Sequence, residues 1–303
     1  MKLVILDGFA INPGDLSWDD LAKIGDVTVY DQTLPHQIAE RIGDAEAIFT
    51  NKCIINEEIL EQCPQLKFIG VLATGYDVIN LDDCRKRGVA VCNVPAYSSE
   101  SVAQHTFALI LELCNNVALH NEAVQQEKWC DYPHYSMVVK PLFQLNGKSL
   151  GIIGYGNIGK RVGEIAEAFG MTIYPYSRDP EKAIKADIIT VHCPATAENK
   201  GFLNKEFFEN MKDGAFLINT ARGALVNESD LAEALRNGKL AGAAVDVVSA
   251  EPMKKDNVLL GVPNLLITPH IAFTTKEARA VVCTTVAENL SSYLEGGRLN
   301  RVD

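Results

Sequence analysis

The sequence lacks the usual marks of a secreted, metal-binding or membrane-spanning protein. Its eight cysteines form no Cys-x-x-Cys pair and are scattered through apolar segments, which is typical of buried, reduced thiols in a cytoplasmic protein. No apolar run approaches the ~20 residues that span a bilayer. The run at residues 2–6 is too short for a signal-peptide core, so we expect it to be the first strand.

Positive charge is also scarce. The chain has 28 Lys and Arg against 39 Asp and Glu, which gives a net charge of -11. A field of this sign repels phosphate, so we expect neither nucleic acid nor a membrane surface as a partner. The 303 residues predict two domains, at roughly 100–200 residues each.

What the chain does contain is a regular alternation of short apolar runs and helical patterns. In the first third, we expect strands at residues 2–6, 27–30, 47–50, 68–72 and 89–91, and helices at 15–24, 35–42, 56–63 and 80–87. In the second part, we expect strands at 149–153, 172–176, 187–192, 215–219, 242–247 and 265–267, and helices at 157–169, 204–211 and 229–237. Such alternation implies right-handed crossovers and parallel sheets.

Three further segments indicate how the two units are joined. Residues 98–114 predict a long connecting helix, and residues 275–294 predict a helix that returns to the first unit. The less regular stretch 115–147 is interpreted as an arm that packs on a partner subunit. The fold class is therefore α/β, with two doubly wound parallel-sheet domains. One comprises residues 1–97 and 271–303, and the other, residues 98–270, is inserted into it.

A dinucleotide fingerprint opens the inserted domain and marks it as a Rossmann domain. Gly154-Tyr155-Gly156-Asn157-Ile158-Gly159 follows an apolar strand and begins an amphipathic helix, which is the context that G-x-G-x-x-G requires. Gly154 permits the tight turn, Gly156 lets the backbone approach a pyrophosphate, and Gly159 lets the helix pack on the strand. The helix N-terminus then attracts the anion. The alternative is a glycine-rich turn that binds nothing.

The end of the second strand bears on the choice of cofactor. An NAD site has an acidic residue there, whereas this chain has Ser177 followed by Arg178. A hydroxyl and a guanidinium suit a 2′-phosphate, which favours NADP over NAD. Asp179 would serve NAD if the register of the strand slips. Pro175, inside the strand, predicts a sheet edge, and the short link from Arg178 to residue 187 predicts that the usual third strand is missing.

Three charged or titratable residues follow three expected strands of the second unit: Arg222, Glu251 and His270. Ligands of open α/β sheets bind beyond the carboxyl ends of the strands, so we expect these side chains in one crevice. Histidine can protonate a carbonyl oxygen as hydride reaches the carbon, and a carboxylate on its other nitrogen fixes the tautomer. An arginine can hold a substrate carboxylate in two-point geometry. Separately, each residue has a purely structural alternative.

The ordered motifs resemble the D-isomer-specific 2-hydroxyacid dehydrogenase family over almost the whole chain. They are the segments 71–77, 101–106, 154–159, 192–194, 219–223, 243–247, 251–252 and 269–272. The resemblance implies a flavodoxin-like substrate domain around the Rossmann domain, no metal, and a homodimer. It also implies an acid/base role for His270, with Glu251 as its partner and Arg222 as the ligand of the substrate carboxylate.

The resemblance implies further contacts. The N–H groups near Ala73, Thr74 and Gly75 should bind the substrate carboxylate. Thr106 should touch the cofactor phosphate, and Asp246 the nicotinamide amide. The residues expected to line the cofactor cleft are Cys193, Pro194, Thr220 and Ala221.

Within the family, segments 93–97 and 269–273 are similar to glycerate dehydrogenases, also called hydroxypyruvate reductases. The expected reaction is reduction of hydroxypyruvate or glyoxylate to D-glycerate or glycolate. Two alternatives remain. A phosphoglycerate dehydrogenase-like enzyme would need cations for the phosphate, and residues 72–78 contain none. A dinucleotide-sensing protein like the corepressors built on this fold would also keep the three residues, but it usually carries extensions that this sequence lacks.

Overall fold

The computed structural model describes all 303 residues and separates them into two compact units. Residues Met1–Ser98 and Phe273–Asp303 form one unit, which we call the split unit. Residues Ser99–Ala272 form the other, the inserted unit. No helix in either unit is both long and apolar enough to cross a bilayer.

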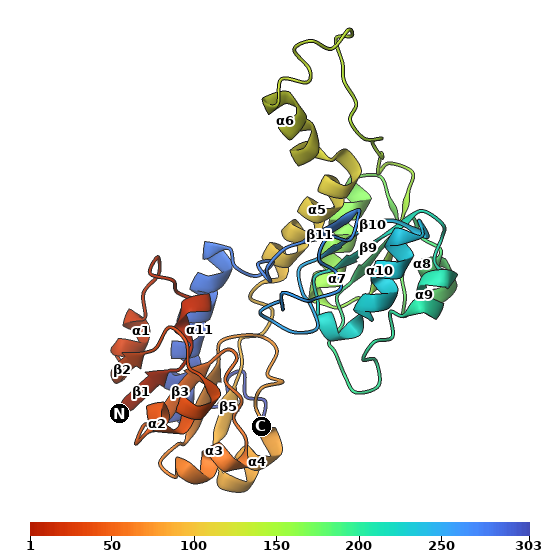
Figure 1. Ribbon diagram of the computed structural model, residues 1–303. Helices are drawn as coiled ribbons and strands as arrows, with labels where there is room; N and C mark the ends of the chain where they lie inside the picture. Colours follow the sequence, from red (N-terminus) through yellow and green to blue (C-terminus); the bar gives the residue numbers. More distant parts are fainter. The chain divides into compact units, whose positions relative to one another are not determined.

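The split unit contains a five-stranded parallel sheet in the order β2-β1-β3-β4-β5 (Figure 1). Its strands are β1 (Lys2–Ile5), β2 (Asp26–Val29), β3 (Ala47–Thr50), β4 (Phe68–Val71) and β5 (Ala90–Cys92). Its helices are α1 (Asp19–Ala22), α2 (Ile38–Ile42), α3 (Glu57–Gln62), α4 (Leu81–Arg87) and α11 (Lys276–Leu294). Short 3-10 turns cover Gly8–Ala10 and Pro35–Gln37.

Local chemistry explains where the helices of the split unit begin and end. Asn56 and Asn80 accept hydrogen bonds from the first-turn N–H groups of α3 and α4, as N-caps do. Gly88 ends α4 in the left-handed conformation. Helix α11 returns to this unit, as expected, and packs its Val282 and Val286 against the same core as Phe68 of β4.

The inserted unit has six parallel strands in the order β11-β10-β9-β8-β6-β7. They are β6 (Ser149–Ile153), β7 (Thr172–Pro175), β8 (Ile188–Val191), β9 (Ala215–Asn219), β10 (Leu240–Val245) and β11 (Leu265–Ile267). The helices are α5 (Ser99–Asn115), α6 (Val117–Gln125), α7 (Asn157–Ala168), α8 (Pro180–Ile184), α9 (Lys205–Asn210) and α10 (Glu228–Arg236), and a 3-10 turn covers Gly223–Leu225.

Strand β7 lies at the edge of this sheet, which confirms the prediction that the usual third strand is missing. The five-residue helix α8 follows β7 and packs on β6 and β7. Gly151 of β6 makes this packing feasible, because a Cβ atom there would lie 2.2 Å from the carbonyl oxygen of Ala183. A short helix therefore covers the sheet next to its edge strand.

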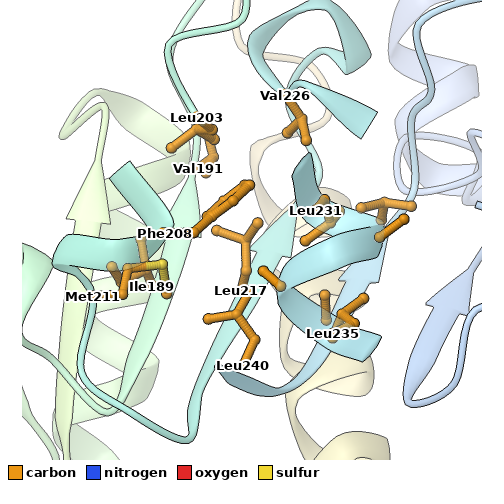
Figure 2. Close-up of a cluster of buried hydrophobic side chains, with 14 of the residues drawn as sticks. Ile189, Val191, Leu203, Phe208, Met211, Leu217, Val226, Leu231, Leu235 and Leu240 are labelled. Carbon is orange, nitrogen blue, oxygen red and sulfur yellow. The ribbon is translucent and has the colours of Figure 1, made fainter. Parts of the chain in front are cut away.

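Two apolar layers cover the sheet of the inserted unit. On one face, α9 and α10 pack against alternate residues of the central strands, with Phe208, Leu217 and Leu231 at the centre (Figure 2). On the other face, α5 and α7 pack against residues such as Ile152 and Ile218. Both faces of the strands are buried, as in other parallel sheets. This packing fixes the strand ends from which the functional loops emerge.

Helix α6 was not predicted, because residues 115–147 contain no clear helical period. Figure 1 shows α6 and the following loop extending away from the sheet of the inserted unit. This segment, which we call the arm (residues 117–142), exposes several large apolar side chains. They are Val117, Leu119, Val124, Trp129, Tyr132, Tyr135, Val138, Val139 and Leu142.

The cysteines are free, as expected. Six are buried, Cys193 is partly exposed and Cys130 is exposed.

Candidate active site

The glycine loop between β6 and α7 has the geometry that a pyrophosphate site needs. Gly154 has a φ angle of +91°, and a Cβ atom there would lie 2.5 Å from the backbone nitrogen of Cys193. A Cβ atom on Gly159 would lie 2.2 Å from the carbonyl oxygen of Gly154. At Gly156, by contrast, a Cβ atom would meet nothing within 4 Å. The first and third glycines thus allow close packing, and the second leaves open space above the loop.

Helix α7 begins at this open space. Its N-cap is Gly156, and no side chain caps its first turn. The N-terminal N–H groups therefore remain for a ligand, and the helix dipole favours an anion there. The residues present fit the diphosphate of a dinucleotide.

The residues expected at the end of β7 lie close to this loop. Ser177 and Arg178 are exposed, and the guanidinium carbon of Arg178 lies 5.2 Å from the centre of the Tyr155 ring. Asp179 is the N-cap of α8: its carboxylate accepts a hydrogen bond from Lys182 N–H and pairs with the Lys182 ammonium at 2.8 Å. The hydrogen bond to Lys182 is the first cause of the lowered pKa of the Asp179 carboxyl.

Arg222, Glu251 and His270 follow the three adjacent strands β9, β10 and β11 at their carboxyl ends. His270 Nδ1 lies 2.6 Å from Glu251 Oε2, and the two side chains are 25% and 30% exposed. The other oxygen of Glu251 accepts the N–H of Val248 at 3.2 Å. With Nδ1 bonded to a carboxylate, Nε2 is the ring atom that can exchange a proton with a ligand.

The backbone of Arg222 is held by Asn219, the last residue of β9. Asn219 is fully buried. Its amide donates to the carbonyl of Arg222 at 2.9 Å, and its oxygen accepts the N–H of Ala221 at 3.0 Å. The guanidinium of Arg222 also donates to the carbonyl of Ala221 at 2.8 Å. Asn219 was missed as a functional residue, although an asparagine at a strand end is a common way to fix a turn.

Gly223 brings the Arg222 turn against the loop that carries Glu251. A Cβ atom on Gly223 would lie 2.0 Å from both the carbonyl carbon and the oxygen of Val248. The same loop is held by Glu228, whose carboxylate accepts Ser249 N–H at 2.6 Å and the Asn257 amide at 2.9 Å. Neither Gly223 nor Glu228 was assigned a role from the sequence. A cavity of about 310 Å³ lies beside these contacts, lined in part by Glu228, Ser249 and Asn257.

The structure also places the remaining expected site residues of the inserted unit. Thr106 is fully buried, and its hydroxyl lies 3.0 Å from that of Thr220. Asp246 is also buried. Cys193 is partly exposed, and burial raises the pKa of its thiol, so the group stays protonated. The carbonyl of Pro194 accepts the amide of Asn199 at 2.9 Å.

In the split unit, the expected substrate loop at Ala73, Thr74 and Gly75 follows β4. The Thr74 hydroxyl donates to the carbonyl of Val94 at 2.8 Å, and the Asn93 amide donates to the carbonyl of Thr74 at 2.8 Å. The N–H of Val94 donates to the carbonyl of Ala73 at 3.1 Å. These three hydrogen bonds hold the loop through its carbonyl and hydroxyl groups. None of them uses a backbone N–H group of residues 73–75.

His192 follows β8 and precedes Cys193. The residue as a whole is partly exposed, but both ring nitrogens are buried and have no hydrogen-bond partner, as is also true of the Thr190 hydroxyl. Burial lowers the pKa of His192 to about 3, so the imidazole stays neutral. Its buried, unpaired ring nitrogens distinguish His192 from His270, whose Nδ1 is bonded to Glu251.

An open glycine loop, an uncapped helix start, and an imidazole–carboxylate pair and an arginine after adjacent strands define a dinucleotide-dependent dehydrogenase. The sequence of residues 107–272 matches the family model of the D-isomer specific 2-hydroxyacid dehydrogenase, NAD binding domain. The chain belongs to that family, and it is an NAD(P)-dependent dehydrogenase that acts on the CH–OH group of 2-hydroxy acids.

The chain is 42% identical to a hydroxypyruvate reductase of Blautia hydrogenotrophica, over the full length of both. Two solved structures are also similar over 100% of this chain. One is a D-lactate dehydrogenase of Aquifex aeolicus complexed with NAD and lactic acid, at 29% identity and a TM-score of 0.84, matched over 99% of its length. The other is the acyclic imino acid reductase Bsp5 in complex with NADPH and D-Arg, at 28% identity and a TM-score of 0.86, matched over 100% of its length.

Proposed function

We propose that this enzyme reduces hydroxypyruvate to D-glycerate, and glyoxylate to glycolate. The observation that carries the proposal is the His270–Glu251 pair, bonded at 2.6 Å at the ends of two strands, with Arg222 following the next strand of the same sheet. The full-length similarity to a hydroxypyruvate reductase supports this choice of substrate. Residues 72–78 add no positive charge, which suits a small keto acid without a phosphate.

The three residues have complementary roles in this reaction. The reduced nicotinamide supplies a hydride to C2 of the keto acid. His270 gives the proton from Nε2 to the carbonyl oxygen, and Glu251 stabilises the imidazolium before that transfer. Arg222 holds the substrate carboxylate and so orients the carbonyl. In the reverse direction, the neutral imidazole accepts the hydroxyl proton.

We assign cofactor binding to the inserted unit, which also carries Arg222, Glu251 and His270, and a further substrate-binding loop to the split unit. The N–H groups of Ala73, Thr74 and Gly75 would form that loop's binding site for a carboxylate. The glycine loop would hold the diphosphate, Thr106 would serve a cofactor phosphate, and Asp246 the nicotinamide amide. Cys193, Pro194, Thr220 and Ala221 would line the cleft.

NADP is the proposed cofactor. The carboxylate of Asp179 caps α8 and pairs with Lys182. These contacts occupy the carboxylate that would otherwise bind a ribose hydroxyl. Arg178 lies over the ring of Tyr155, which places a guanidinium beside the glycine loop. Ser177 adds a hydroxyl without negative charge. Together these groups suit a 2′-phosphate better than a bare 2′-hydroxyl.

The arm supports a homodimer, because it exposes Trp129, Tyr135, Val138 and Leu142 together. An exposed apolar segment of this kind marks a protein interface. A cytoplasmic location fits the free cysteines, six of which are buried.

The test is the loss of absorbance at 340 nm with NADPH or NADH and a panel of 2-keto acids, including 3-phosphohydroxypyruvate. We expect hydroxypyruvate to give the highest kcat/KM. His270→Ala should lower kcat by about 10²–10⁴, the range for losing a general acid/base. The exposed His36 offers a matched control, and His36→Ala should keep full activity.

Other outcomes identify the alternatives. A preference for the phosphorylated acid would indicate a phosphoglycerate dehydrogenase-like enzyme. Binding of the dinucleotide without turnover of any keto acid would indicate a sensing protein.

A further inference from the structure

The backbone of His270 is held in an unusual conformation. Its φ angle is +56°, in the left-handed region that residues other than glycine rarely occupy. Such a conformation persists only where the surrounding contacts determine it, and it is common at functional sites. The contacts that determine it here come from the inserted unit itself.

Asp246, the first residue after β10, binds three consecutive amide groups around His270. Its backbone carbonyl accepts the N–H of His270 at 2.8 Å. Its carboxylate accepts the N–H groups of Ile271 and Ala272, both at 2.9 Å. Only 1% of Asp246 is exposed, so water does not compete for these bonds. This one residue therefore fixes the turn that presents His270.

The carboxylate of Asp246 is held in turn by Thr268 and His105. The Thr268 hydroxyl donates to Asp246 Oδ1 at 2.6 Å and lies 3.0 Å from His105 Nε2. That nitrogen is also 3.5 Å from Asp246 Oδ1. Burial would by itself raise the pKa of the Asp246 carboxyl, but the bonds from His105, Thr268 and the two amide groups outweigh burial and lower it. The carboxylate thus stays charged and able to accept every bond.

We propose that Thr268 and His105 are positioning residues that act through Asp246 to hold the His270 turn, and with it the bond between His270 and Glu251. The inference rests on the proposed acid/base role of His270. This positioning role differs from a role of Asp246 in binding the nicotinamide amide. Loss of positioning would slow the chemical step and leave cofactor affinity unchanged, whereas loss of amide binding would weaken cofactor affinity.

Two substitutions at Thr268 separate these roles. Thr268→Val keeps the shape but removes the hydroxyl, whereas Thr268→Ser keeps the hydroxyl. We expect Thr268→Val to lower kcat about 10- to 100-fold, since misplacing a catalytic group by about 1 Å has effects of this size. The Kd of NADPH, measured by fluorescence titration without substrate, should change by less than about twofold, and Thr268→Ser should keep kcat within about threefold of the wild type. His105→Phe should show the same pattern with a smaller loss, because Thr268 still bonds Asp246.

Two kinetic results would overturn the proposal. One is weaker NADPH binding by Thr268→Val with kcat intact at saturating cofactor. The other is equal loss of kcat in the Val and Ser variants, which would make the hydroxyl irrelevant.

A crystal structure of Thr268→Val provides a readout that does not depend on activity. We expect the φ angle of His270 to leave the left-handed region, or the Nδ1 atom of His270 to separate from Glu251. An unchanged His270 turn would refute the positioning role of Thr268, whether or not the wild type reduces a keto acid. A wild type that reduces no keto acid would refute only the proposed function.

Discussion

Gly223→Ala tests whether the spacing between the Arg222 turn and the Glu251 loop controls catalysis. The new Cβ atom would lie 2.0 Å from Val248, whereas real Cβ contacts stay above 3.0 Å, so the two backbone segments must separate by about 1 Å. A displacement of about 1 Å in a catalytic group can lower the rate about 10²-fold, equivalent to about 2.7 kcal/mol of activation free energy. We expect kcat/KM for hydroxypyruvate to fall by that factor.

The assay is steady-state reduction at saturating NADPH, with the Kd of NADPH measured separately. Because the glycine loop that would hold the diphosphate lies elsewhere, the affinity for NADPH should fall much less than kcat/KM. Gly238→Ala is the matched control: Gly238 has a φ angle of +78° and open space around it. That substitution strains the backbone by about 1–2 kcal/mol and does not touch either loop. Full activity of Gly223→Ala, or an equal loss in Gly238→Ala, would refute the reasoning.

Three further predictions concern single side chains. Arg222→Ala should raise KM for the keto acid and lower kcat, and Arg222→Lys should restore little, because an ammonium cannot make the two-point contact; full activity of Arg222→Ala in steady-state kinetics would exclude the role. Ser177→Asp should shift kcat/KM from NADPH toward NADH by about tenfold or more, since a carboxylate repels the 2′-phosphate and accepts the 2′-hydroxyl; an unchanged ratio would remove Ser177 from the cofactor argument. The pKa of His192 lies at about 3 in the folded state against 6.5 when exposed, so the unfolded state binds more protons between these values and the unfolding free energy decreases as the pH falls. His192→Asn should reduce the pH dependence of the unfolding free energy by at most about 1.4 kcal/mol per pH unit. The measurement is the shift of the urea midpoint between pH 7 and pH 5, and an equal shift in the wild type and the variant would contradict the prediction.

The fold was largely predictable because most of its strands, such as β3, β4, β8 and β9, are buried on both faces. The run Ala215–Asn219, for example, is apolar up to its last residue and bounded by turns, so its position matches the predicted one. Pro175 revealed the sheet edge because proline cannot donate a ladder hydrogen bond. Helix α6 was missed because only Ala123 in it is buried. A helix without a buried face shows no helical period of apolar residues in its sequence.

The candidate site was predicted less completely. Arg222, Glu251 and His270 could be found because charged residues after strands signal the carboxyl edge of the sheet. Gly223 and Asn219 act through close approach and hydrogen bonds between segments distant in sequence, and no local pattern reports such contacts. The bonds from Thr268 to Asp246 likewise join residues from different strand ends.

The three residues of the proposed acid/base and carboxylate site all lie between residues 99 and 272, after consecutive strands of one sheet. Their alignment is therefore built into a single rigid layer and does not need a second body to complete it.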